Sequence, residues 1–492
     1  MNLVAPTDAR RAIVEALPVD TSLHGKVPDR RKVYVPASHV KALRLECNLV
    51  IGARGVGKTF WSAALRSKEI RALLGIELSD YPHISKVGTG FGESPALEAY
   101  PDSDVFADLM EKGFEPYYVW RGVAAHWLTE LLEEDIPDRS WIETVEWVRS
   151  QPEAFARLCE RANAHLETKG GSGLIVFDAL DRTSSDWHTT DRIVRDLLRV
   201  VLSMKRFPLL HGKVFLRDDQ FEARAITDFP DSSKLLATRV DLTWASHDLH
   251  GLLWHYLCNA SETSAELMRG IYEREVGEIP SLREGDVWVL DDRARREGAI
   301  QRKLFVALAG EWMGRDRRRG IPYTWSVGHL ADGRGRTSPR SFLAAVRAAA
   351  EDTQERYPEH SRPLHYESIK RGVQKASEIR VSELAEDYPW VRKLMEPLRG
   401  LTVPCYFEQI EARWKASLAG HPSDVDFRSL SEKRLPPEHY QVGWSGVRQD
   451  LEKLGIFERM TDGRVNMPDL YRVGFGLGRR GGVKPIVSAE RR

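Results

Sequence analysis

The stretch that decides the fold is Leu49-Val50-Ile51-Gly52-Ala53-Arg54-Gly55-Val56-Gly57-Lys58-Thr59. It places a short apolar run before the pattern G-x-x-x-x-G-K-T, and residues 60–67 after it suit a helix. A strand, a phosphate-binding loop and a helix in this order are typical of a nucleoside triphosphate site. The glycines allow backbone conformations in which several N–H groups face one phosphate, and the helix N-terminus adds partial positive charge. A chance glycine-rich turn is the alternative, and the flanking patterns argue against it.

The residue types in this loop predict their contacts. We expect Lys58 to reach the β- and γ-phosphates and Thr59 to offer its hydroxyl to Mg²⁺. The cofactors expected from the loop are therefore a nucleoside triphosphate and Mg²⁺. The residues that we expect to bind the nucleotide are consecutive: Gly52, Ala53, Arg54, Gly55, Val56, Gly57, Lys58, Thr59 and Phe60.

The composition excludes several classes of protein. The chain has 492 residues, of which 42% are hydrophobic, and this is enough for packed cores. Lys plus Arg equals Asp plus Glu at 72 each, so a contact with nucleic acid or a membrane surface needs a local patch. The four cysteines are far apart and form no C-x-x-C pair, which argues against a zinc site and a disulfide framework. We find no signal-peptide core and no run of about 18 apolar residues, and we expect a cytoplasmic protein without a membrane segment.

Three further short runs predict strands of the same sheet. Asp178 follows the run 173–177, and Arg217 follows the run 213–216. The third run is 239–244. Helices are predicted between them. Strands that alternate with helices predict an α/β fold with a doubly wound parallel sheet. A buried parallel strand of this kind delivers its terminal carboxylate to the carboxyl edge of the sheet.

Between the phosphate-binding loop and residue 173 we predict an insertion, one strand and two helices. Residues 69–115 carry many Gly, Pro and Ser residues, including the run 88–92, and we expect an insertion or lid there. The second strand is expected at 114–120. Helices are expected at 122–133 and 151–168.

Shifts in pattern predict five parts of the chain. We expect a leader with one short helix at 8–15, a P-loop ATPase core, a helical lid, a helical and winged-helix domain, and a basic flexible tail. The winged helix is predicted from a helix at 443–454 and a hairpin that turns at Asp462-Gly463. The expected bounds of the five parts are 1–40, 41–258, 259–357, 364–475 and 476–492.

Basic residues of the predicted winged helix indicate a possible contact with DNA. Arg448 and Lys453 lie on the predicted recognition helix, Arg459 and Arg464 lie on the hairpin, and the tail adds further arginines. Such residues neutralise phosphates and give weak, salt-sensitive binding. The alternative is a winged helix that serves as an internal packing module. The acidic neighbours that favour this alternative are Asp450, Glu452, Glu458 and Asp462.

Four residues outside the loop complete a predicted phosphoryl-transfer site. We expect Asp178 to hold Mg²⁺ together with Thr59, and Asp181 to polarise the attacking water. Arg217 is expected at the γ-phosphate. Arg340 follows a predicted helix cap and proline at 338–339 and is expected to swing over the nucleotide.

Each of these four residues has a structural alternative. Asp178 would be a helix cap or a surface carboxylate, and Asp181 would pair with Arg182. Arg217 would pair with Asp218 or Asp219, and Arg340 would be an ordinary surface residue. No glutamate follows Asp178, because the next residue is Ala179. Its absence predicts slow turnover or a switch that is read by conformation.

Together these motifs resemble the STAND and KAP branch of the AAA+-related P-loop ATPases, in the ASCE division. The resemblance implies ATP with Mg²⁺, with Lys58, Asp178 and Asp181 as catalytic residues. It further implies that Arg217 and Arg340 act as sensors of the nucleotide. The motifs that carry it are GARGVGKT at 52–59, IVFDALDR at 175–182, KVFLRDD at 213–219, Leu242-Thr243-Trp244, and SPRSFL at 338–343.

The resemblance implies a slow ATP-hydrolysing molecular switch. Such a switch acts on partner proteins, with an effector or a sensor among them, and forms a homo-oligomer on ATP binding. By analogy, its setting is prokaryotic anti-phage defence. One alternative is an AAA+ initiator-like ATPase that binds DNA through the winged helix. A second alternative is a nucleotide-binding scaffold without turnover.

Overall fold

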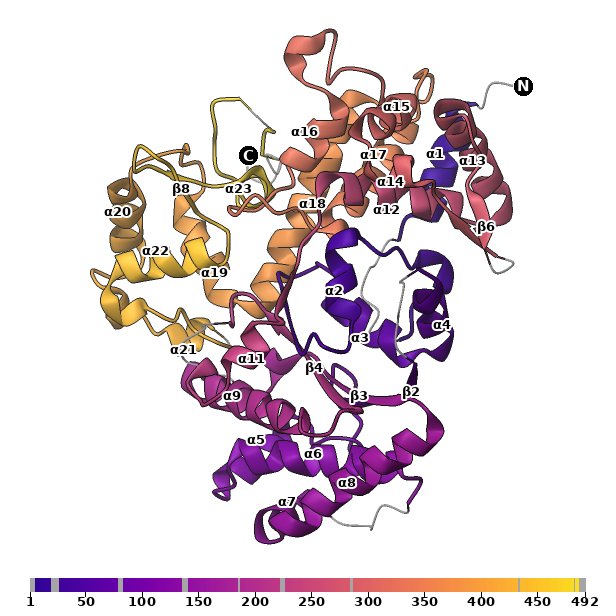
Figure 1. The fold of residues 1–492 in the computed structure, drawn as a ribbon. Coiled ribbons are helices and arrows are strands. Elements are labelled where there is room, and N and C mark those ends of the chain that lie inside the picture. The colour runs from indigo at the N-terminus through magenta and orange to yellow at the C-terminus, as the bar shows by residue number, and fades with distance from the viewer. Residues whose placement is uncertain are drawn as a thin grey trace. The chain divides into compact units, whose positions relative to one another are not determined.

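The chain folds into two compact units. The computed structural model describes residues 5–18, 26–77, 83–134, 140–184, 186–221, 226–283, 286–431, 434–481 and 483–485 (Figure 1). The core unit is Ser22–Thr243, and the helical unit combines Met1–Thr21 with Trp244–Arg492. The chain therefore begins in the helical unit, enters the core unit and returns.

A five-stranded parallel sheet forms the centre of the core unit. Its strands are β1 (Leu49–Gly52), β2 (Ile84–Phe91), β3 (Ser172–Phe177), β4 (Leu210–Arg217) and β5 (Val240–Leu242). Their order in the sheet is β2-β3-β4-β1-β5, and every pairing is parallel. The predicted α/β fold with a parallel sheet is confirmed. Because β4 lies between β1 and β3, the loop after β1 and the aspartate after β3 flank the end of β4.

Helices of the core unit cover both faces of this sheet. Figure 1 shows α2–α4 on one side of the strands and α5–α8 on the other. Helices α6, α8 and α9 share a buried apolar cluster with alternate residues of the strands, among them Ile51, Ile175 and Phe177. The helices are α2 (Val40–Leu43), α3 (Lys58–Arg66), α4 (Lys68–Glu77), α5 (Ser103–Glu111), α6 (Pro116–Leu131), α7 (Trp141–Ser150), α8 (Pro152–Lys169), α9 (Trp187–Met204) and α11 (Ser233–Leu236).

The prediction of a strand at 114–120 is wrong. These residues enter α6, whose first turn holds Pro116. The second strand is β2, inside the stretch predicted as an insertion or lid. A Cβ on Gly88 would lie 2.2 Å from Cδ1 of Trp127, and a Cβ on Gly90 would lie 2.2 Å from Cε1 of Phe177. The strand therefore needs glycine where aromatic rings approach its backbone, and these glycines hide its strand pattern.

In the part of the helical unit that follows the core unit, α17 packs against α18 and α12. A short antiparallel hairpin, β6 (Ser281–Arg283) and β7 (Val287–Val289), follows α13. The predicted cap of α17 is present, because the Ser338 side chain accepts a hydrogen bond from the Ser341 N–H. The helices are α12 (Ser246–Cys258), α13 (Glu262–Val276), α14 (Asp292–Arg296), α15 (Gly298–Ala309), α16 (Pro322–Gly328), α17 (Pro339–Arg356) and α18 (Tyr366–Asp387).

The N-terminal helix α1 (Pro6–Ala16) belongs to the helical unit and is not a separate leader. It packs against α13 and α17. Arg10 is 1% exposed, and its guanidinium donates hydrogen bonds to four backbone oxygens of the loop between α17 and α18. The four acceptors are the carbonyls of Pro358, His360, Arg362 and Pro363.

A winged helix follows α18, as predicted. The hairpin of β8 (Glu458–Arg459) and β9 (Val465–Asn466) comes directly after α22 (Trp444–Lys453). An antiparallel bridge between Cys405 and Val465 adds a third strand position to the hairpin. The other helices of this part are α19 (Pro389–Met395), α20 (Phe407–Ser417), α21 (Phe427–Leu430) and α23 (Asp469–Arg472).

The residues predicted to begin a flexible tail are hydrogen-bonded to the segment before α20. The Gly400 N–H donates to the Gly476 carbonyl, and the Gly478 N–H donates to the Leu401 carbonyl. Arg472 is 0% exposed and forms an ion pair with Asp469. The remainder of the predicted tail, residues 482 and 486–492, lies outside the described residues.

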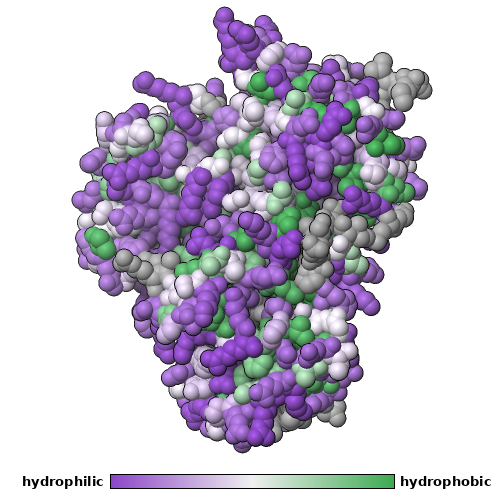
Figure 2. Space-filling view, viewed as in Figure 1, coloured by the Kyte–Doolittle hydropathy of each residue, from purple (hydrophilic) through white to green (hydrophobic). Residues whose placement is uncertain are grey.

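On the face drawn in Figure 2, hydrophilic residues cover most of the surface and hydrophobic ones lie in small groups. Among the described helices, none combines the length and apolar character needed to span a bilayer. The 3₁₀ helices are Arg30–Lys32, Ala37–His39, Leu180–Arg182, Arg317–Arg319, Glu396–Leu398, Pro422–Asp424 and Tyr440–Val442.

Candidate functional site

The loop between β1 and α3 has the backbone of a phosphate cradle. Gly55 and Gly57 have φ values of 78° and 107°, in the left-handed region that favours glycine. A Cβ on Gly52 would lie 2.6 Å from Cγ1 of Val56, so the start of the loop also needs glycine. Helix α3 begins at Lys58, and its N-terminal N–H groups therefore lie at the end of the loop. Such a helix N-terminus attracts anions.

Several charged residues around this loop act on Lys58. Its Nζ donates hydrogen bonds to the carbonyl oxygens of Gly52 and Ala53, at 2.8 and 3.0 Å. The pKa of Lys58 is lowered to about 8, mainly by burial and to a smaller extent by the nearby charge of Arg217. Aspartates at the ends of β3 and β4, Asp178 among them, act in the opposite direction. The side chain is therefore poised between its charged and neutral forms near pH 8.

Asp178 lies beside the phosphate-binding loop, as we expected from the sequence. It follows β3, is 4% exposed, and its carboxylate lies close enough to the Thr59 side chain for that side chain to lower its pKa. Burial raises the pKa of Asp178, and the charge of Lys58 opposes this rise. The backbone N–H of Asp178 donates to the Phe91 carbonyl at 3.0 Å, which ties the residue to the end of β2. The two residues expected to hold Mg²⁺, Thr59 and Asp178, thus lie side by side.

The turn after Asp178 has an unusual backbone. Ala179 has φ 57° and ψ 32°, a left-handed conformation that a Cβ disfavours. The turn places Asp181 beside Arg217, with 3.8 Å between Oδ2 and Nη1. Arg182 lies instead near Glu93, with 3.5 Å between Nη2 and Oε1. The alternative in which Asp181 pairs with Arg182 is therefore not the arrangement in the structure.

Arg217 ends β4 and is bound by a carboxylate from its own strand end. Its Nε and Nη2 donate to the two carboxylate oxygens of Asp219, at 3.1 and 2.8 Å. The side chains of Arg217 and Asp219 are only 11% and 7% exposed. The pairing that the sequence offered as an alternative to a nucleotide contact is thus present, and Arg217 also faces the predicted catalytic Asp181.

Arg340 lies at the start of α17 in the helical unit. Its Nη1 forms a 2.7 Å ion pair with Oε1 of Glu383 on α18. This pair joins two helices of the same unit, and the role of Arg340 at the nucleotide stays a prediction.

The other predicted loop residues divide by burial. Val56 is buried, while Ala53, Arg54 and Phe60 are partly exposed. The Phe60 ring packs edge-on against Trp61, with 5.2 Å between ring centroids.

Sequence reasoning missed the contact between Glu93 and Arg182, because the two residues are distant in the chain. It left Asp219 open, because the run Asp218-Asp219 gave no reason to choose between the two carboxylates.

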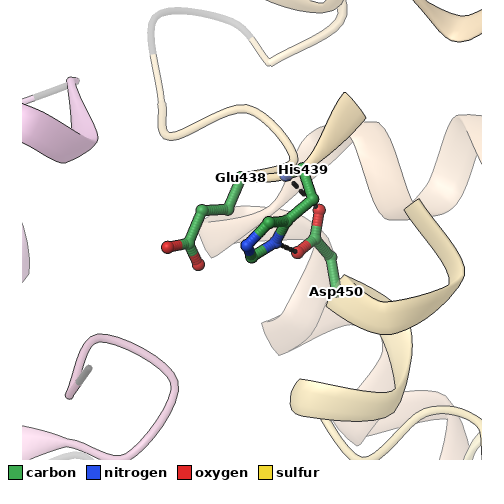
Figure 3. A group of neighbouring side chains, drawn as sticks. All are labelled: Glu438, His439 and Asp450. Atoms are coloured by element: carbon green, nitrogen blue, oxygen red, sulfur yellow. Dashed lines mark hydrogen bonds and ion pairs between the residues drawn. The ribbon is translucent and has the colours of Figure 1, made fainter. Parts of the chain in front are cut away.

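One group among the described residues has the spacing of metal ligands, namely Glu438, His439 and Asp450. Figure 3 shows the His439 ring between the two carboxylates. Asp450 accepts hydrogen bonds from both the ring Nδ1 and the backbone N–H of His439, at 2.6 and 2.9 Å. Glu438 accepts a 2.6 Å hydrogen bond from Lys453. These partners make the group a hydrogen-bonded junction between α22 and the segment before it, with Lys453 as its cation.

The basic residues of the winged helix are largely paired with acidic neighbours. Lys453 binds Glu438, and Arg448 lies 3.4 Å from Glu452. On the hairpin, Arg464 forms a 2.7 Å ion pair with Asp462. Arg459, Arg479 and Arg480 are exposed.

The chain was compared with known proteins. No family model matches it, and no curated protein matches it. Similar solved structures include ORC2 of Aeropyrum pernix in its ADPNP–ADP complexes, with 14% identity and a TM-score of 0.36 over 86% of this chain and 84% of that chain. ORC1 of Aeropyrum pernix in complex with DNA has 16% identity and a TM-score of 0.32 over 91% and 92%. Cdc6p of Pyrobaculum aerophilum has 11% identity and a TM-score of 0.32 over 90% and 94%. Values of this size assign neither a family nor a function to this chain.

Proposed function

We propose that this chain is an AAA+-related P-loop ATPase that binds Mg²⁺–ATP at the carboxyl edge of its sheet and handles DNA in the manner of an initiator. The observation that supports the nucleotide site most is that the buried Asp178 carboxylate lies within reach of the Thr59 side chain and of the charge of Lys58. In the sheet, β4 lies between β1, which precedes the phosphate-binding loop, and β3, which precedes Asp178. This strand order also fits the ASCE division of P-loop ATPases, which the motifs resemble.

The residues at this edge fit a magnesium nucleotide. A hydroxyl from Thr59 and a carboxylate from Asp178 are oxygen ligands of the kind that Mg²⁺ prefers. When bound, Mg²⁺ neutralises charge on the phosphates. The N–H groups of the loop and of α3 would bind phosphate oxygens. Lys58 would exchange its bonds to the Gly52 and Ala53 carbonyls for bonds to phosphate.

Asp181 and Arg217 supply the remaining groups for hydrolysis. Asp181 is 28% exposed at its side chain and so stays accessible to water, which it would orient toward the γ-phosphate. Arg217 would place positive charge near that phosphate. Ala179 follows Asp178 where a carboxylate would make a stronger base, so we propose slow turnover.

The winged helix favours the initiator-like function over a scaffold. It has a helix, a hairpin and a third bridged strand position in the expected order. Since Arg448, Lys453 and Arg464 are paired with acidic residues, we assign phosphate contacts to the exposed Arg459 and Arg480. A few such contacts give weak binding that falls steeply with salt.

Two measurements on the full chain test this proposal. Phosphate release from Mg²⁺–ATP should exceed the background of a Lys58→Ala protein and should be lost in Asp181→Ala. Affinity for duplex DNA should fall with salt, and the double variant Arg459→Ala/Arg480→Ala should weaken it. Arg464→Ala is the control, because Asp462 already neutralises Arg464. DNA affinity that is insensitive to Arg459 and Arg480 would contradict the DNA role, and wild-type release no greater than that of Lys58→Ala would contradict the ATPase role.

A second candidate is an ATP-dependent switch that acts on a partner protein. The observation that favours it is the pairing of basic residues on α22 and the hairpin, which suits protein packing better than DNA contact. We propose the cytoplasm as its location and assembly into a homo-oligomer on ATP binding. Size-exclusion chromatography with and without ATP tests the assembly. A setting in anti-phage defence stays a prediction from the sequence.

A further inference from the structure

The carboxylate of Asp219 holds Arg217 in one orientation. Its two oxygens accept from Nε and Nη2, so one whole edge of the planar guanidinium is bound in a fork. The other side of the group, at Nη1, faces Asp181 at 3.8 Å. A bidentate pair fixes both the position and the plane of an arginine, which a single hydrogen bond does not.

The same sequence spacing occurs at a second strand and provides a contrast. Arg239, directly before β5, and Asp241, within it, also stand two residues apart, and Nη2 lies 2.9 Å from Oδ2. Their side chains are 35% and 53% exposed, against 11% and 7% for Arg217 and Asp219. Exposed pairs of this kind contribute little, whereas a buried arginine needs its carboxylate. The fork at Arg217 is thus a buried arrangement beside the loop.

The surroundings of Arg217 explain why a carboxylate is needed. Lys58 lies close enough for the two cations to repel each other. Asp219 acts on Lys58 with the opposite sign. Without Asp219, this repulsion would move the guanidinium away from Lys58.

We propose that Asp219 is a positioning residue that keeps Arg217 between Asp181 and the phosphate-binding loop, so that Arg217 distinguishes a nucleoside triphosphate from a diphosphate. This inference rests on the proposed nucleotide site. We expect Asp219 to affect the choice between triphosphate and diphosphate through Arg217, and not by contact with a phosphate.

The test is a double-mutant cycle on the full-length protein, with ADPNP and ADP as ligands in the presence of Mg²⁺. Calorimetry gives the ratio of the two affinities for each protein. Arg217→Ala should reduce the preference for ADPNP about tenfold, as expected for loss of one charge-assisted hydrogen bond. Asp219→Ala should reduce it by a similar factor. Arg217→Ala/Asp219→Ala should reduce it no further, because Asp219 acts through Arg217.

Control variants distinguish a failure of this inference from a failure of the proposed nucleotide site. Asp241→Ala removes the matched exposed pair and should leave the ratio unchanged. Asp219→Asn keeps the size of the side chain, and the double variant removes both buried charges, so these proteins answer the question if Asp219→Ala does not fold. A wild-type ratio near one, an Asp219→Asn ratio equal to wild type, or effects of the two single variants that multiply would overturn the inference. Wild-type protein that binds neither nucleotide would instead overturn the proposed function.

Discussion

At the residue scale, the backbone of Ala179 is the clearest departure from ordinary geometry at the site. Its left-handed conformation costs a residue with a Cβ about 1–2 kcal/mol, and glycine avoids this cost but loses about 0.5–1 kcal/mol through its flexibility. We predict that Ala179→Gly raises the free energy of unfolding by up to about 1 kcal/mol. Chemical denaturation measures it.

The same exchange elsewhere serves as the control for this prediction. Ala164 lies exposed within α8, where glycine costs about 1 kcal/mol. Ala164→Gly should therefore destabilise the protein. Equal destabilisation by Ala179→Gly would contradict the strained turn.

The pKa of Lys58 predicts how nucleotide affinity depends on pH. Phosphate binds the ammonium form, and burial lowers the pKa of Lys58 to about 8, so raising the pH through 8 removes the binding charge. We expect affinity for Mg²⁺–ADP to fall by up to about tenfold per pH unit above pH 8. Titrations between pH 7 and 9.5 measure this slope.

An arginine at the same position separates this effect from others. Lys58→Arg keeps its charge throughout this range, so its affinity should show no such slope even if it is lower overall. A wild-type affinity that is constant from pH 7 to 9.5 would show that Lys58 does not contact the phosphates.

The motif residues could be placed from sequence because chemistry fixes their spacing. Lys58 and Thr59 follow from the loop pattern, and Asp178 follows from the end of an apolar strand. The partners of Arg182 and Arg217 could not be predicted in this way. Glu93 is far from Arg182 in the chain, and the choice between Asp218 and Asp219 depends on side-chain geometry.

At the element scale, β2 shows how tertiary packing overrides local pattern. The Trp127 side chain lies against the backbone of Gly88, so a methyl group there has no room. We predict that Gly88→Ala lowers the free energy of unfolding of the core unit by about 1–3 kcal/mol through overpacking. Gly75→Ala is the control, because the described structure places nothing within 4 Å of a Cβ there and α4 favours alanine. Urea denaturation followed by tryptophan fluorescence compares them, and equal stability of the two variants would contradict the close packing.

We predict that helix α1 contributes to the stability of the helical unit. Arg10 is buried and bonds to four carbonyls, whereas the neighbouring Arg11 has a side chain that is 76% exposed. Arg10→Ala should lower the free energy of unfolding of this unit by about 3 kcal/mol, because it leaves buried carbonyls without partners. Arg11→Ala should change it by less than about 0.5 kcal/mol. Hydrogen exchange of α17 reports the difference, and equal exchange in the two variants would contradict this role for α1.

The elements themselves were predictable where their pattern was local. The strand that ends at Arg217 and the hairpin that turns at Asp462-Gly463 are both present. The place of α1 was not predictable, because the Arg10 hydrogen bonds join residues about 350 positions apart.

At the scale of the whole molecule, the chain leaves the core unit next to the helix that follows the loop. The Trp61 indole N–H on α3 donates to Nδ1 of His39, and Nε2 of His39 donates to the carbonyl of Thr243, the last residue of the core unit. Burial lowers the pKa of His39 to about 4, so the ring is neutral at pH 7 and keeps this pattern. These two hydrogen bonds thus link α3 to the last residue of the core unit.

The central claim is that Thr59 and Asp178 hold Mg²⁺ against a nucleotide in the loop. The most direct test measures nucleotide affinity with and without Mg²⁺, for the wild-type protein and for Asp178→Asn. We predict that Mg²⁺ strengthens ATP binding by the wild-type protein, and that Asp178→Asn still binds ATP but loses most of this strengthening. Wild-type protein without affinity for Mg²⁺–ATP, or an Asp178→Asn protein with the full effect of Mg²⁺, would contradict the claim.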